Sequence, residues 1–135
     1  MNILVDTCIW SLALRRASPA DSQYVRELKE LINEQRVVLI GPVRQEILSG
    51  IREQTQFTAL REKLRAFVDF PLLPEDYEMA ADYFNTCRRA GVQGSNTDFL
   101  LCAVSARHAI PIYTCDADFN SYRKHLPFLL HQPRE

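Results

Sequence analysis

The stretch Ile3-Leu4-Val5-Asp6-Thr7-Cys8-Ile9-Trp10 decides the fold of this chain. Its apolar first part predicts a buried β-strand, and Thr7 begins a pattern with helical spacing that runs to Arg16. Asp6 therefore stands where a strand ends and a helix begins. In open α/β sheets this carboxyl edge is where ligands bind. The alternative is that Asp6 only caps the helix by accepting protons from its free amide groups.

Length and composition fit one globular domain over residues 1–135. Apolar residues make up 47% of the chain and charged residues 24%, as in ordinary soluble proteins. No apolar run reaches the ~20 residues that span a membrane, and no signal-peptide pattern follows Met1, so we expect a cytoplasmic protein with no membrane partner. The net charge of −1 argues against nonspecific coating of a nucleic acid, although it allows a local basic rim.

The cysteines do not predict a zinc site. Cys8, Cys87, Cys102 and Cys115 are far apart, and together with the histidines they show none of the usual zinc-ligand spacings. We expect buried or half-buried thiols in a reducing compartment. Cys8 and Cys115 would be neighbours if both flank the same edge of a sheet.

Short apolar runs alternate with helical patterns along the rest of the chain. Further strands are predicted at residues 37–40, 67–72 and 111–114, with an edge strand at 128–130. Helical patterns cover residues 42–51, 56–66, 75–90 and 97–109, and Ser18-Pro19-Ala20-Asp21 fits the start of another helix that runs to about residue 35. This alternation predicts an α/β three-layer sandwich, in which helices cover both faces of a parallel sheet of four to five strands.

Four acids follow predicted strands or lie early in predicted helices. Asp6 follows the first strand and Asp116 follows the strand at 111–114, while Glu46 lies about one turn into the helix that follows the second strand. Because the carboxyl ends of parallel strands share one edge, we expect these side chains on the same side of the sheet. Asp98, near the start of an apolar helix, joins them if that helix begins on the same side.

Each acid also has an ordinary structural explanation. Ser95-Asn96-Thr97-Asp98 fits a capping box, and both Asp116 and Asp118 fit turn positions. Glu46 is the hardest to explain in this way. It lies at the margin of an apolar helical stripe, where a carboxylate is costly unless it is paired.

Converging carboxylates repel one another, which either raises a pKa or recruits a cation. Oxygen ligands alone favour a hard ion, Mg²⁺ or Mn²⁺, over zinc. Such an ion can neutralise a phosphate and activate water, so the predicted chemistry is hydrolysis of a phosphodiester. Arg123 and Lys124 lie closest in sequence to Asp116 and are the favoured phosphate contacts. The other basic candidates fit solvated helix positions better: Arg15, Arg16, Arg88, Arg89 and Arg107.

Four short motifs occur in a fixed order: Val5-Asp6-Thr7, Glu46 after Gly41-Pro42, Thr97-Asp98-Phe99, and Thr114-Cys115-Asp116-Ala117-Asp118-Phe119. Together they resemble the PIN domain, and the chain is similar to the VapC-type ribonuclease toxins of type II (VapBC) toxin–antitoxin systems. The resemblance implies a five-stranded parallel sheet and Mg²⁺- or Mn²⁺-dependent endonucleolytic cleavage of RNA. It also implies a VapB-type antitoxin that blocks the site, and a homodimer.

The resemblance also assigns roles to individual residues. The catalytic acids would be Asp6, Glu46, Asp98 and Asp116, and three of them, Asp6, Asp98 and Asp116, would hold the metal. Thr7 and Thr114 would orient the carboxylates, with Asp118 as a structural residue behind Asp116. Cys8 departs from the family, in which this position is more often polar. The near-neutral net charge favours a structured RNA substrate. The resemblance implies that this RNA is of the tRNA or rRNA class.

Two other classes stay open. A receiver-like signalling domain also gathers acids and Mg²⁺ at a sheet edge, but the second predicted strand ends in Gly41-Pro42 and no suitably placed lysine follows Tyr113. The second class is a catalytically silent PIN-like scaffold that only binds RNA or protein, which the absence of a motif acid would indicate. None of the four is missing here.

Overall fold

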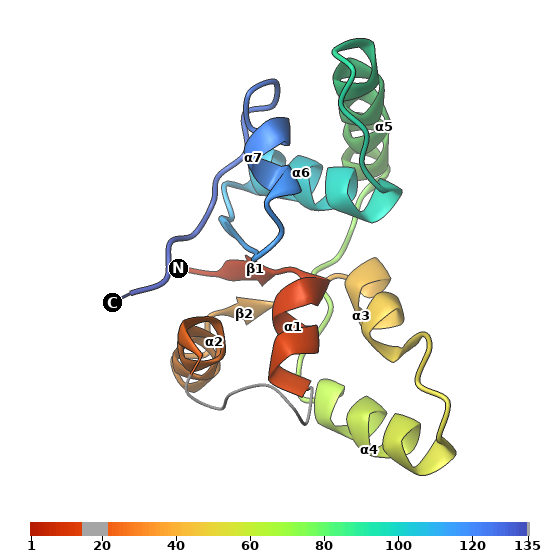
Figure 1. Ribbon diagram of the computed structural model, residues 1–135, viewed down its shortest axis with the longest axis vertical. Helices are drawn as coiled ribbons and strands as arrows, with labels where there is room; N and C mark the ends of the chain where they lie inside the picture. The colour runs from red at the N-terminus through yellow and green to blue at the C-terminus, as the bar shows by residue number, and fades with distance from the viewer. Residues whose placement is uncertain (15–21, 135) are drawn as a thin grey trace.

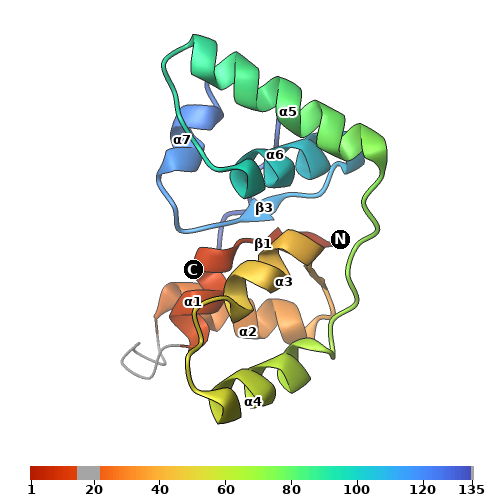
Figure 2. The same ribbon diagram turned by 90° about the vertical axis from the view of Figure 1, so that its right-hand side faces the viewer.

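The structure is a computed structural model that describes residues 1–14 and 22–134. A short parallel sheet lies between two groups of helices, α1–α4 on one side and α5–α7 on the other (Figures 1 and 2). The helices are α1 (Thr7–Leu14), α2 (Gln23–Asn33), α3 (Gly41–Leu48), α4 (Gln54–Leu64), α5 (Pro74–Arg89), α6 (Asn96–His108) and α7 (Asp118–Tyr122). The predicted α/β architecture with a helix-covered parallel sheet is therefore confirmed.

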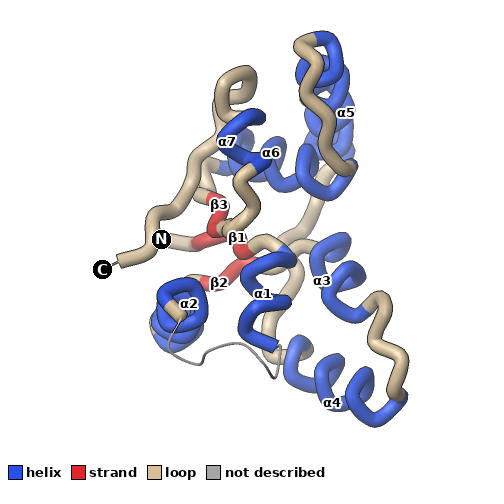
Figure 3. Tube along the Cα trace, in the orientation of Figure 1, coloured by secondary structure: helices blue, strands red, loops and turns tan. Residues whose placement is uncertain are grey.

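The sheet is built around β1 (Ile3–Val5), which pairs in parallel with β2 (Val37–Val38) on one side and β3 (Ile112–Tyr113) on the other. The three strands occupy the centre of the molecule in Figure 3. All residues of β1 are 0% exposed. A strand that is covered on both faces must be apolar at every position, which explains why this run shows no alternation of polar and apolar residues.

The described residues form three strands, so the predicted count of four to five is corrected. The segments predicted as strands at 67–72 and 128–130 contribute only isolated parallel bridges, between Leu39 and Asp69 and between Ile112 and Leu130. Pairing ends early at both segments. Helix α3 begins at Gly41, two residues after Leu39, and the amide of Leu129 donates to Ser105 Oγ at 3.1 Å instead of to β3.

Most predicted helices are present, with ends shifted by one to three residues. Helix α5 places Glu75 and Asp76 in its first turn and Arg88 and Arg89 in its last turn, as the helix dipole favours. The predicted helix start at Ser18-Pro19-Ala20-Asp21 lies outside the described residues, as do Arg15 and Arg16. Within them, the side chain of Ser22 caps α2.

Helix α6 anchors the part of the molecule that carries Asp98. The run from Phe99 to Ser105 is buried all round the helix, because α6 packs against both α5 and β3. A helix buried on all sides holds its first turn in a fixed place relative to the sheet. Across the described ranges, no helix is both long and apolar enough to cross a membrane.

Candidate active site

Asp6 occupies the junction between β1 and α1, where Figure 1 shows β1 pointing towards the starts of α1 and α3. Its side chain is only 5% exposed. The amide of Thr7 donates to Asp6 Oδ1 at 2.7 Å, and the hydroxyl of Thr114 donates to Asp6 Oδ2 at 2.8 Å. The sulfur of Cys8 lies 3.5 Å from the same Oδ2 atom. The carboxylate is thus fixed by three donors from two strand ends.

Thr114 connects Asp6 to Asp116. While its hydroxyl donates to Asp6, its oxygen accepts the amide proton of Asp116 at 3.0 Å. The amide of Asp118 donates to Asp116 Oδ1 at 2.9 Å, so Asp118 orients Asp116 through its backbone. The two acids that end β1 and β3 therefore belong to one hydrogen-bond network.

Asp98 lies in the first turn of α6 and combines a capping position with a second contact. Ser95 Oγ accepts the amide proton of Asp98 at 3.1 Å, which is half of the predicted capping box. The hydroxyl of Tyr122 donates to Asp98 Oδ2 at 2.8 Å. Capping alone therefore does not explain this carboxylate, because α7 supplies a buried donor to it.

Glu46 reaches the site through Thr7, whose hydroxyl donates to Glu46 Oε1 at 2.6 Å. Glu46 lies at the margin of the apolar stripe, as expected, but the expected cost of burying its carboxylate there does not arise, because the residue is exposed. Helix α3 buries only Val43 and Ile47, so the margin of its stripe faces solvent. Thr7, which directly follows Asp6, holds Glu46 near that acid.

Burial and mutual repulsion define the electrostatics. Burial raises the pKa of Asp6, and the negative charge of Asp98 raises it further. Burial likewise raises the pKa of Asp98, to which the charge of Asp116 adds. Over the described ranges, none of the four acids forms an ion pair with lysine, arginine or histidine. The negative charge at this edge is therefore left uncompensated by the protein.

This donor set fits a hard divalent cation by its chemistry. As the side chains stand, no three Asp, Glu, His or Cys residues of the described chain form a ready ligand group. The acids nevertheless offer only oxygen atoms, and Asp116 Oδ2 and Glu46 Oε2 accept no hydrogen bond from the described residues. Uncompensated carboxylates with free oxygens suit Mg²⁺ or Mn²⁺ better than zinc.

Sequence reasoning missed Tyr122 and Gly94. Tyr122 is 0% exposed, and its ring packs against Phe99 and Phe119 with centroids 5.0 and 5.2 Å away. A Cβ atom on Gly94 would lie 2.4 Å from the Tyr122 hydroxyl oxygen, so only glycine leaves room for this hydroxyl. No motif marks either residue, since their roles arise from packing between α6, α7 and the loop before α6.

Cys8 and Cys115 are neighbours, as expected if both flank one sheet edge. The amide of Cys115 donates to the Cys8 sulfur at 3.2 Å, and both thiols are half-buried and free. Burial, followed by the charge of Asp6, raises the pKa of Cys8. The thiol is therefore a protonated donor and a poor nucleophile.

The predicted phosphate contacts lie just after α7. Arg123 and Lys124 are exposed, and their side chains form no ion pair with other described residues. Arg107, by contrast, is 2.8 Å from the buried Asp76. The role of Arg123 and Lys124 stays a prediction.

Solved structures of other proteins share this fold. The chain superposes on a chain of FitAcB from Neisseria gonorrhoeae with a TM-score of 0.75 and 20% identity, covering 97% of each chain. VapBC2 from Rickettsia felis, bound to a DNA fragment from its promoter, gives a TM-score of 0.75 and 15% identity over 100% of both chains. A toxin–antitoxin complex from Klebsiella pneumoniae gives 0.62 and 19% identity, covering 87% of this chain and 90% of that one.

Sequence comparison identifies the family directly. No curated protein matches the sequence. The family described as "PIN domain" matches residues 3–125, which include all four acids of the site and the three strands of the sheet. The chain therefore belongs to the PIN domain family.

Proposed function

We propose that this protein is a Mg²⁺- or Mn²⁺-dependent endoribonuclease and the toxin of a type II toxin–antitoxin system. The observation that carries the proposal is the hydrogen-bonded cluster at the carboxyl edge of the sheet. There Thr114 makes hydrogen bonds to both Asp6 and Asp116. Thr7, the residue after Asp6, donates its hydroxyl proton to Glu46. Membership of the PIN domain family supports nuclease chemistry for this cluster.

In this proposal Asp6, Asp98 and Asp116 hold the divalent ion, directly or through water. When bound, the ion neutralises the scissile phosphate and lowers the pKa of an attached water molecule. Glu46, which is exposed to solvent, is a further ligand or the base that orients the attacking water. Thr114 and Thr7 keep the carboxylates in place by donating their hydroxyl protons.

The proposed substrate is a structured RNA of the tRNA or rRNA class. A chain with a net charge of −1 gains little from general attraction to a polyanion, so it depends on local contacts and on RNA shape. Arg123 and Lys124 are exposed and free to contact phosphates of the bound RNA.

We also infer a VapB-type antitoxin partner, a homodimer and a cytoplasmic location. The solved structures that share the fold are described as FitAcB, VapBC2 and a toxin–antitoxin complex. The shared fold supports the inference over at least 87% of this chain in each of these cases. Co-expression with the product of a neighbouring short reading frame, followed by size-exclusion chromatography, tests both assemblies.

The nuclease proposal is tested with purified protein, a panel of structured RNAs, and Mg²⁺ or Mn²⁺ against an EDTA control. We expect cleavage that EDTA abolishes and that Asp6→Asn reduces by orders of magnitude while the fold, measured by circular dichroism, is retained. Asp82→Asn is the matched control, because Asp82 is an exposed acid on α5. Undiminished cleavage by folded Asp6→Asn protein contradicts the assignment, and RNA binding without cleavage by the wild type supports a silent scaffold instead.

A further inference from the structure

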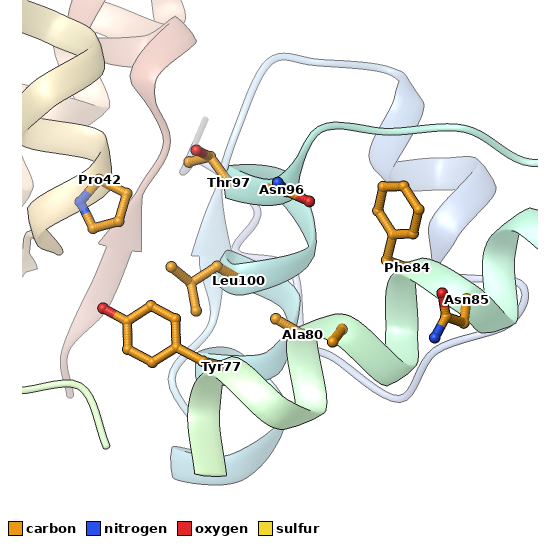
Figure 4. A pocket seen from close by; sticks show the side chains of 9 residues that line it. Pro42, Tyr77, Ala80, Phe84, Asn85, Asn96, Thr97 and Leu100 are labelled. Carbon is orange, nitrogen blue, oxygen red and sulfur yellow. The ribbon is translucent and has the colours of Figure 1, made fainter. Parts of the chain in front are cut away.

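Several hollows lie near the acids, and two of them differ clearly in chemistry. One, of about 490 Å³, begins beside Asn96 and Thr97. Figure 4 shows Tyr77 and Leu100 directed towards Pro42 across it. Its walls are largely apolar, and nothing in the structure shows what covers them. The second hollow, of about 550 Å³, has Thr114 and Asp116 in its own wall and is therefore continuous with the site.

Three segments that are distant in sequence form the second hollow, which we call the C-terminal cavity. They are the start of α2 with Gln23 and Tyr24, residues 114–117 with Phe119 and Asn120 of α7, and the C-terminal residues 130–133. Figure 1 shows the C-terminal segment running from α7 past the sheet to the side where α2 lies. The volume falls within the range of about 300 to 1,000 Å³ that small-ligand sites occupy.

Buried contacts fix the walls of the C-terminal cavity. Glu27 of α2 is 2% exposed and lies 2.7 Å from His131 Nε2. Its other carboxylate oxygen is 2.7 Å from Arg134 Nε, while the guanidinium of Arg134 also makes two hydrogen bonds to Glu34. The C-terminal segment is thereby tied to α2. A cavity with pre-formed walls loses little conformational freedom when a ligand binds.

The contacts of the sheet fix the same walls from the other side. The backbone amide of His131 donates to the carbonyl of Ile112 in β3 at 2.8 Å. The buried hydroxyl of Tyr113 donates to the carbonyl of Tyr24 at 2.9 Å, and the rings of Tyr113 and His131 meet edge to face. The C-terminal segment and the start of α2 are therefore both fixed to β3, the strand that leads to Asp116.

The lining chemistry fits a neutral, planar, hydrogen-bonding group. Gln23, Asn120 and Gln132 place exposed amides at the rim, and none of these side chains forms a hydrogen bond with another described residue. No lysine or arginine is among the lining residues. The carboxylate of Asp116 at the edge of the cavity would repel a phosphate group bound inside it. Amides recognise the edges of nucleobases, and aromatic rings such as that of Tyr24 stack on their faces.

We propose that the C-terminal cavity binds one unpaired nucleobase of the RNA beside the scissile phosphate. This inference rests on the proposed nuclease function for its biological meaning. The base is selected by the amides of Asn120 and Gln132, and the phosphate that follows it reaches the acids past Asp116. The buried Glu27 cluster has the role of holding the cavity wall in position.

The test begins with ligands that carry no phosphate and need no metal. Adenosine, guanosine, cytidine and uridine are titrated separately into ¹⁵N-labelled full-length protein. We expect saturable shifts of the amide signals of residues 114–120 and 130–132, larger for one or two of the four nucleosides. Asn120→Ala and Gln132→Ala should each weaken binding by about three- to tenfold, the loss of one hydrogen bond. Gln56→Ala, an exposed glutamine on α4, is the matched control and should bind as the wild type does.

Cleavage assays on RNA libraries with randomised positions around the cut separate the two proposals. If the cavity reads a base, Asn120→Ala raises KM and relaxes the preference at one position beside the cut. Nucleoside binding at these amides without any RNA cleavage supports the base site and overturns the nuclease. Cleavage with unchanged base preference in both variants, or the absence of shifts with all four nucleosides, overturns the base site and leaves the nuclease proposal standing.

Discussion

The change Tyr122→Phe removes one oxygen atom from the support of Asp98 and leaves the ring in place. The hydroxyl donates to Asp98 Oδ2 at 2.8 Å, and the ring is 0% exposed between Phe99 and Phe119. Phenylalanine can fill the same space, because only the hydroxyl makes a polar contact. The variant should therefore fold, with Asp98 less well fixed.

The size of the effect follows from the kind of hydrogen bond. A hydrogen bond to a charged group contributes about 1.5 to 3 kcal/mol. Asp98 is only half-buried, so water can replace part of the lost contact, and we take the lower end of this range. About 1.5 kcal/mol corresponds to roughly a tenfold change in an equilibrium constant. We expect Mn²⁺ affinity to fall about tenfold in Tyr122→Phe.

Calorimetric titration with Mn²⁺ measures this affinity without RNA. Tyr83→Phe is the matched control, because Tyr83 is also buried, at 8% exposure, and its hydroxyl forms no hydrogen bond with the described residues. That variant should bind Mn²⁺ as the wild type does. Gly94→Ala should weaken Mn²⁺ binding as well, because the new Cβ atom would lie 2.4 Å from the Tyr122 hydroxyl oxygen. Wild-type Mn²⁺ affinity in folded Tyr122→Phe protein would refute the positioning role of this hydroxyl.

Three further results are expected. Asp98→Asn should raise the thermal midpoint of the protein in EDTA at neutral pH, because it removes a charge that burial and Asp116 oppose; a lower midpoint would count against this repulsion. Burial raises the pKa of Asp6 and Asp98, so the folded state binds protons more tightly than the unfolded state. The free energy of unfolding in EDTA should therefore fall as the pH rises from the pKa of these acids in the unfolded chain to their higher pKa in the folded protein. Mn²⁺ affinity should weaken as the pH falls, because the ligands become protonated. The opposite slope in either titration would contradict these shifts. Leu4→Ala, at the centre of the sheet with 0% exposure, should cost about 2 to 5 kcal/mol in urea unfolding, and a smaller loss would mean that the core there is loosely packed.

The parts of the site that were predictable from sequence lie at strand ends. Asp6 directly follows an apolar run and Asp116 comes three residues after Tyr113, so the parallel arrangement alone places them at one edge. The helix-covered sheet was predictable for the same reason. The number of strands was not, because apolar patterning does not show which backbone amides pair across the sheet and which bond elsewhere, as the amide of Leu129 does to Ser105 Oγ.

Contacts between distant segments were beyond sequence reasoning. Helical periodicity placed Glu46 near an apolar stripe, but only the packing of α3 against its neighbours decides that it is exposed and bonded to Thr7. Tyr122 supports Asp98 from another helix, and Gly94 matters only because that hydroxyl fills the space beside it. Such roles depend on tertiary geometry, which no local pattern encodes.

The central claim is that the acids at the carboxyl edge of the sheet share one divalent ion. Anomalous diffraction from crystals of the full chain soaked in Mn²⁺ tests this claim most directly. We predict a manganese peak at coordinating distance from the carboxylates of Asp6, Asp98 and Asp116, which Asp98→Asn weakens or removes. Crystals with this edge open to solvent that show no peak there would contradict the account.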